Sequence, residues 1–116
     1  TPEYSSAASD VYKRQSLSHE DMTVKVNGMM SISGEYKGFE DFLHNMLARL
    51  PVLFTNFKVE PIEMISEGNK VFVRVKGSAD GMETMFGHYF EVSDSGKMVT
   101  MMTFDDTLSM FNAMKK

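Results

Sequence analysis

The segment HYFEVSDSGKMVTMMTFDDT, residues 88–107, decides the fold class of this chain. Two runs rich in hydrophobic and β-favouring residues flank Asp94-Ser95-Gly96, where the glycine suits the positive φ of a tight turn. The pattern predicts an antiparallel hairpin with strands over 85–93 and 97–104. We therefore expect a sheet in which strands that follow one another along the chain pair with one another.

The second strand of this hairpin stops at two carboxylates, Asp105 and Asp106. Because alternate side chains of a strand point to opposite faces, one of the two should face the interior and the other should face away. A tight turn places Met102 opposite His88 and Asp106 about one diagonal step beyond, which makes His88 and Asp106 the expected acid/base pair. A carboxylate in an apolar interior has a raised pKa, which suits proton transfer near neutral pH.

Each member of this pair also has a structural interpretation. Asp106 or Thr107 stands where the N-cap of a helix over 108–114 would lie, and both residue types accept backbone hydrogen bonds there. His88 alternates with phenylalanines, as a hydrogen-bonded core histidine does. The residues alone leave both interpretations open.

The segment 39–50 is the strongest helix prediction. Acidic residues stand in its first turn and Arg49 in its last turn, which matches the helix dipole. Pro51 should end or bend the helix near Leu50. Hydrophobic side chains recur on one face at helical spacing: Phe39, Phe42, Leu43, Met46, Leu47 and Leu50.

Alternating patterns predict further strands before and after this helix. Two precede it, over 22–26 and 29–32, with Asn27-Gly28 as a turn signal between them and a loop over 34–38. Two follow it, over 57–65 and 71–76, and Pro61 places the first of them at an edge or a bulge. A helix followed by a run of consecutive strands indicates an α+β fold with an antiparallel sheet of four to six strands on one long helix.

Composition excludes several classes of function. The chain of 116 residues has 42% hydrophobic residues and a formal net charge of -4, so one domain with a real core is expected and a nucleic-acid or membrane partner is not. It contains no cysteine, which fits a reducing, cytoplasmic location. The three histidines show no zinc spacing, and we expect neither a metal nor a cofactor. The 12 methionines fit either an irregular core or an adaptable apolar pocket.

The N-terminal segment differs from the rest of the chain. Residues 1–15 are small, polar and aperiodic, so we expect a tail, and the piece SSAASDVYKRQ resembles linker-derived translation rather than native sequence. The domain itself is expected over 16–116.

Residues 17–114 resemble the NTF2-like superfamily, in particular its SnoaL-like and ketosteroid-isomerase-like branches. The resemblance is carried by Gly34-x-Tyr36-x-Gly38 before a helix, by Glu67-Gly68-Asn69-Lys70-Val71 before a strand, by Asp94-Ser95-Gly96-Lys97-Met98, and by Phe104-Asp105-Asp106-Thr107 before the closing helix. It implies a cone, in which a strongly curved antiparallel sheet wraps around helices and leaves an apolar cavity, and it implies a homodimer.

The resemblance also implies site residues. SnoaL-like cyclases use an acid as general base at the position that matches Asp106, and His88 joins it as the second candidate catalytic residue. The side chains expected to line the pocket are Tyr36, Met46, Phe86, Phe90, Met98, Met102 and Phe104.

One departure from the family limits the function that the resemblance implies. Family members begin with one or two helices, whereas the first strand expected here begins near residue 21, so truncated N-terminal helices are expected. The tyrosine and the general-base aspartate of steroid isomerases come from that early region and have no match here, since Tyr4, Asp10 and Tyr12 lie in the tail.

Two hypotheses follow. The first is a SnoaL-like protein that binds a small apolar or polyketide-like molecule and carries out cofactor-free acid/base chemistry of an isomerase, cyclase or hydrolase type. The alternative is a non-catalytic ligand-binding or dimerisation module of the same fold, since a fold does not determine a reaction.

Overall fold

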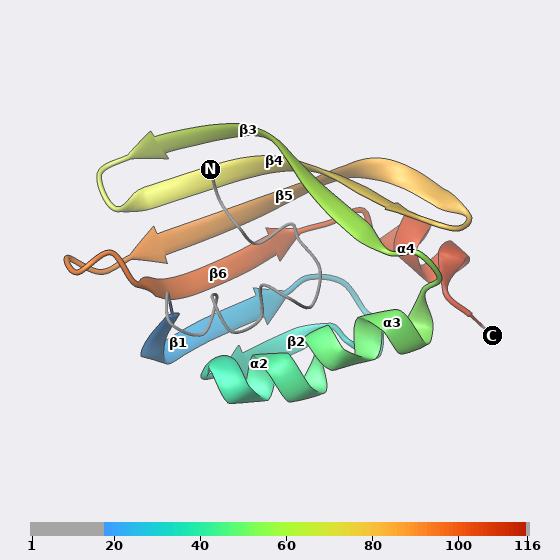
Figure 1. The fold of residues 1–116 in the computed structure, drawn as a ribbon, viewed down its shortest axis with the longest axis horizontal. Coiled ribbons are helices and arrows are strands. Elements are labelled where there is room, and N and C mark those ends of the chain that lie inside the picture. The colour runs from blue at the N-terminus through green and yellow to red at the C-terminus, as the bar shows by residue number, and fades with distance from the viewer. Residues whose placement is uncertain (1–17, 116) are drawn as a thin grey trace.

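The computed structural model describes residues 18–115 and shows a curved six-stranded sheet with helices against one face and one end (Figure 1). The tail expected over 1–15 lies outside the described residues. The strand order is β2-β1-β6-β5-β4-β3. The strands are β1 (Ser18–Val26), β2 (Gly34–Lys37), β3 (Lys58–Glu67), β4 (Lys70–Ala79), β5 (Met82–Val92) and β6 (Met98–Phe104). The helices are α2 (Phe39–Asn45), the 3-10 turn η2 (Leu47–Arg49), α3 (Leu50–Leu53) and α4 (Thr107–Ala113).

The α+β fold and the antiparallel run β3-β4-β5-β6 are as predicted. Each strand of this run pairs antiparallel with the next, and β3 is an edge strand with a register shift between Pro61 and Glu63. Proline lacks the N–H that a ladder needs, which explains both the edge and the bulge. The one parallel pair in the described sheet is β1 with β6, which brings the end of β1 beside the end of β6.

The strand predicted over 29–32 and the loop over 34–38 are wrong, because β2 is Gly34–Lys37 and the residues before it form a compact loop. Within this loop the Met30 N–H donates to the Ser33 hydroxyl, which donates in turn to the Asn27 carbonyl. Met30 and Ile32 belong to the buried core, so their hydrophobic character was not a sign of a strand.

The helix predicted over 39–50 is broken into α2, η2 and α3. Met46, between α2 and η2, has φ -129° and ψ -63°, which is not helical. Pro51 lies in the first turn of α3, where its missing N–H costs nothing, whereas in a continuous helix its ring would clash with the carbonyl four residues earlier. Proline therefore starts the last short helix rather than ending the long one.

The core lies between the concave face of the sheet and the helices. In Figure 1, α2 and α3 run along the β1 and β2 side of the sheet, and α4 lies at the end where β6 stops. The central strands β4, β5 and β6 send alternate side chains into this space, and Val73, Val75 and Phe86 among them are at most 3% exposed. No helix among residues 18–115 is both long and apolar enough to cross a bilayer.

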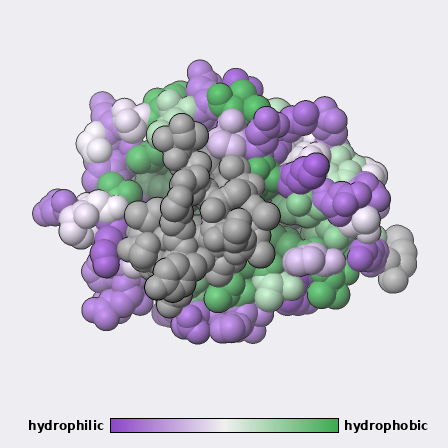
Figure 2. Space-filling model, viewed as in Figure 1, coloured by the Kyte–Doolittle hydropathy of each residue, from purple (hydrophilic) through white to green (hydrophobic). Residues whose placement is uncertain are grey.

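Hydrophobic side chains also reach the surface. Figure 2 shows them on the face that carries the helices, and more of them lie on the convex face of the sheet. Cross-strand register places Ile65, Phe72, Met85 and Phe104 together on that convex face, and each is at least 39% exposed. We refer to these four residues as the convex patch.

Candidate functional site

A small, mostly apolar cavity lies between the concave face of the sheet, the α2–α3 segment and α4. Its volume is about 60 Å³, room for roughly four water molecules or a chemical group of similar size. Three of the lining residues, His88, Thr103 and Asp105, bring polar side chains to the cavity. The apolar lining residues are Phe42, Met46, Leu47, Leu50, Phe57, Val59, Phe86, Met101 and Met110.

His88 and Asp105 form a buried pair in this cavity. The His88 Nε2–H donates to Asp105 Oδ1 over 3.1 Å, and the two side chains are only 8% and 7% exposed. An ionised carboxylate only accepts hydrogen bonds, so this contact selects the tautomer of neutral His88 with its proton on Nε2. The ring of His88 also stacks on Phe86, with centroids 6.4 Å apart.

The partner of His88 is Asp105 and not Asp106, because the register of the β5–β6 hairpin differs by one residue from the expected one. His88 lies opposite Thr103 rather than Met102, and a register shift occurs between Glu91 and Val92. A slip of one residue moves every side chain of a strand to the other face. The row that faces His88 is therefore the row that contains Thr103 and Asp105.

Asp106 is the N-cap of α4. Its Oδ1 accepts the Ser109 N–H at 3.1 Å, and its Oδ2 accepts hydrogen bonds from the hydroxyls of Ser109 and Thr84, each at 2.7 Å. These bonds favour the ionised form, the Ser109 hydroxyl most, then the Thr84 hydroxyl, and they lower the pKa of Asp106. The raised pKa expected for Asp106 is therefore wrong, because its carboxylate is held by donors rather than by apolar walls.

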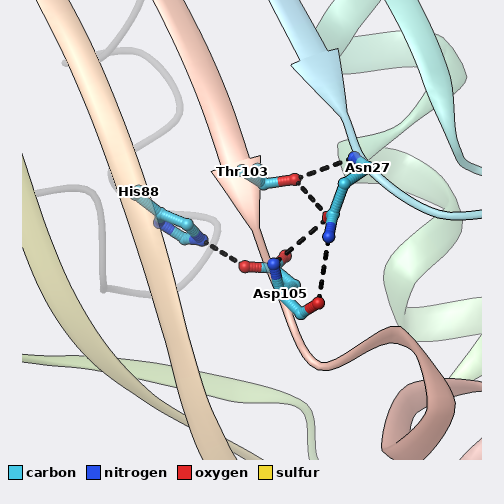
Figure 3. Close-up of polar contacts among 4 residues, drawn as sticks. All are labelled: Asn27, His88, Thr103 and Asp105. Carbon is cyan, nitrogen blue, oxygen red and sulfur yellow. Dashed lines mark hydrogen bonds and ion pairs between the residues drawn. The ribbon is translucent and has the colours of Figure 1, made fainter.

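Asn27 joins the ends of β1 and β6 next to this pair (Figure 3). Its amide Nδ2 donates to the Asp105 carbonyl at 3.0 Å, and its Oδ1 accepts the Asp105 N–H at 3.2 Å and the Thr103 hydroxyl at 2.9 Å. The Asn27 N–H donates to the Thr103 hydroxyl at 3.2 Å. The sequence marked Asn27 only as part of a turn, since the contact with Asp105 spans 78 positions of the chain.

The other residues expected in the pocket separate into two groups. Met46 and Phe86 line the cavity, and Phe90 and Tyr36 are buried but are not among its lining residues. The Tyr36 hydroxyl donates to the Ile32 carbonyl, and burial raises its pKa. Met98, Met102 and Phe104 are also not among the lining residues. Met98 is half-buried, Met102 lies opposite Tyr89, and Phe104 is 54% exposed on the convex face.

No group of three or more side chains that could hold a metal ion occurs in the described part of the chain, 18–115. The polar groups at the cavity are the His88 ring, the Asp105 carboxylate and the Thr103 hydroxyl, held together in a small apolar space.

Comparison with known proteins identifies the fold. No family model and no curated protein sequence matches the chain. Among solved structures, TerC co-crystallised with polyporic acid has a TM-score of 0.78 at 22% identity, over 90% of this chain and 85% of that one. An NTF2-like protein of unknown function from Burkholderia pseudomallei K96243 has a TM-score of 0.78 at 19% identity, over 93% and 87%. A putative SnoaL-like polyketide cyclase from Jannaschia sp. CCS1 has a TM-score of 0.71 at 19% identity, over 89% and 76%.

Proposed function

We propose that this protein, which shares the NTF2-like fold of these structures, binds the polar end of a small apolar molecule. At that end it transfers protons without a cofactor. The observation that carries the proposal is the His88–Asp105 pair, joined over 3.1 Å in an otherwise mostly apolar cavity. Support for the class of ligand comes from TerC, which was crystallised with polyporic acid, and from the putative polyketide cyclase.

The geometry supports general-base catalysis by His88. With the proton of the neutral ring on Nε2, its second nitrogen, Nδ1, holds a lone pair and can take a proton from a carbon next to a carbonyl group. The substrate becomes an enolate, and the imidazolium that forms is stabilised by the Asp105 carboxylate 3.1 Å away. Return of the proton to another atom completes an isomerisation, whereas replacement of the imidazolium proton by one from water, before return to the same carbon, completes an exchange. Neither step needs an oxidant or a reactant other than water.

Cyclopentanone in deuterium oxide tests this chemistry, because it is a compact ketone whose α-protons exchange only slowly by themselves. We expect the wild-type protein to accelerate deuterium uptake, followed by proton NMR, and His88→Gln to reduce that acceleration about 100-fold or more. His44→Gln is the matched control, because His44 is 65% exposed and pairs only with the exposed Glu40 among the described residues.

The result that would overturn the proposal is a wild-type exchange rate equal to that of His88→Gln. The small cavity would then favour the dimerisation module of the alternative, since about 60 Å³ is well below the size of most ligand pockets.

We also propose that two copies of the chain pair through the convex patch. An exposed apolar patch of this kind marks an interaction surface. Ion pairs on the same face, Arg74 with Glu63 at 3.3 Å and Lys76 with Glu83 at 3.5 Å, neutralise four of its charges within each copy. These pairs reduce the repulsion between two identical faces, which meet in a two-fold interface.

Phe72→Glu should convert this dimer to a monomer, because it puts a charge in the middle of the patch, opposite Ile65 on one side and Tyr89 on the other. Light scattering coupled to size-exclusion chromatography measures the mass. Val52→Glu is the control, since Val52 is 70% exposed on α3, away from the sheet. A wild-type protein that is monomeric at 50–100 μM would contradict the dimer.

A further inference from the structure

We propose that Asn27 is a positioning residue that fixes the direction of the Asp105 carboxylate and, through it, the tautomer of His88. The inference rests on the proposed function for its catalytic meaning, but its structural content can be tested without any substrate. The four residues involved come from the end of β1, from β5, and from the end of β6 (Figure 3).

The first step is that Asn27 holds both peptide groups of one residue. Its Oδ1 accepts the Asp105 N–H at 3.2 Å and its Nδ2 donates to the Asp105 carbonyl at 3.0 Å. A residue whose N–H and C=O are both fixed has little freedom in φ and ψ, so the direction of its Cα–Cβ bond is fixed and only a few staggered rotamers remain for its side chain. Here that direction leads to His88 Nε2 at 3.1 Å.

The second step is that Asn27 is itself held in place. The Thr103 hydroxyl donates to Asn27 Oδ1 at 2.9 Å and accepts the Asn27 N–H at 3.2 Å, so two further bonds orient the amide. The next residue, Gly28, has φ +92°, and a Cβ added there would lie 2.6 Å from Thr107 Cγ2. The turn after Asn27 therefore packs directly on the first residue of α4, and the end of β1 cannot drift from the end of β6.

The third step is that the amide group of asparagine is the side chain that suits this position. It offers an acceptor and a donor on neighbouring atoms, as the N–H and C=O of Asp105 require. An aspartate at position 27 would bring a second acceptor against the Asp105 carbonyl, and an alanine would leave both peptide groups without this partner. Both replacements free the backbone of Asp105 but leave His88 and the Asp105 carboxylate chemically unchanged.

The experiment compares Asn27→Ala and Asn27→Asp with the wild-type protein by nitrogen-15 NMR of the histidine rings. In the wild type we expect His88 Nε2 to carry the proton, with a signal well separated from that of Nδ1. In the folded variants we expect the two His88 signals to move toward each other as the tautomers mix, and the acceleration of cyclopentanone exchange to fall about 100-fold. Asn45→Ala is the matched control, because exposed Asn45 donates to the Asp41 carboxylate at 2.7 Å, and its variant should leave His88 unchanged.

Unchanged His88 ring signals in folded Asn27→Ala would overturn the inference, whatever the exchange rate does. Should that variant fail to fold, Thr103→Val provides the same test. It removes two of the hydrogen bonds that orient Asn27 without replacing Asn27 or Asp105 themselves. The failure of the proposed chemistry is distinguishable from this result, since it would appear as the absence of exchange in the wild-type protein.

Discussion

Replacing Asp105 by asparagine should lower the acceleration of cyclopentanone exchange about 1,000-fold while leaving the protein folded. The buried carboxylate has two tasks, to select the Nε2–H tautomer of His88 and to stabilise the imidazolium after proton transfer. A neutral amide can donate to Nε2 as readily as accept from it, and it offers no charge to the cation. Both losses act on the transition state, so we expect the effect in the turnover rate, with little change in the concentration of ketone that gives half the maximal rate.

Asp106→Asn is the matched control for this prediction. It makes the same chemical change one residue later, where asparagine can still accept the Ser109 N–H as an N-cap, and the hydrogen bonds of the Asp106 side chain go to Thr84 and Ser109. Equal loss of exchange in the two variants would contradict the assignment of the chemistry to Asp105.

The difference in stability between the wild type and Asp106→Asn should also depend on pH. Folding lowers the pKa of Asp106, so the ionised carboxylate stabilises the native state above the unfolded pKa of about 4, and this stabilisation is lost as the pH falls through the native pKa. Melting temperatures of the wild type and of Asp106→Asn should therefore differ at pH 7 and converge below about pH 4.

Much of the fold follows from local patterns along the chain. The turn residues between β5 and β6, the alternation in β4 and the proline in β3 each act through neighbouring residues, and the structure places these elements as the sequence predicted. The parallel pairing of β1 with β6 depends on contacts between residues more than 70 positions apart, such as Val24 and Met101, and no local pattern indicates it.

The candidate site depends in part on strand register, which local sequence patterns do not predict. Strand alternation correctly divided β6 into two faces, one ending in Asp105 and the other in Asp106. Which face meets His88 depends on a register shift near Val92, and a shift of this kind has no clear signature in the residues. The two roles considered for a single aspartate, cap and acid/base partner, fall on neighbouring residues, of which Asp106 is the cap and Asp105 is the residue that contacts His88.

Replacing Phe54 by alanine should lower the free energy of unfolding by about 3–5 kcal/mol, a large part of the 5–15 kcal/mol typical of a domain. Phe54 is the largest of the fully buried side chains among residues 18–115, and it is 1% exposed. It follows α3, its N–H donates to the Leu50 carbonyl at 2.9 Å, and its ring contacts that of Phe57 at a centroid distance of 5.1 Å. Removing the ring leaves a void next to Phe57 in the core. Urea denaturation measures the loss.

The control for this change is Phe111→Ala, which removes the same atoms from a ring that is 59% exposed on α4. It should change the stability by about 0.5 kcal/mol or less, because little apolar surface is returned to water. Phe54→Leu should fall between the two, since leucine refills part of the space and keeps the protein folded if alanine does not. A loss at Phe54 no larger than the loss at Phe111 would mean that the α3 segment does not pack on the sheet. The cavity wall that Leu47, Leu50 and Phe57 provide would then be absent as well, and with it the apolar surroundings that the His88–Asp105 pair needs.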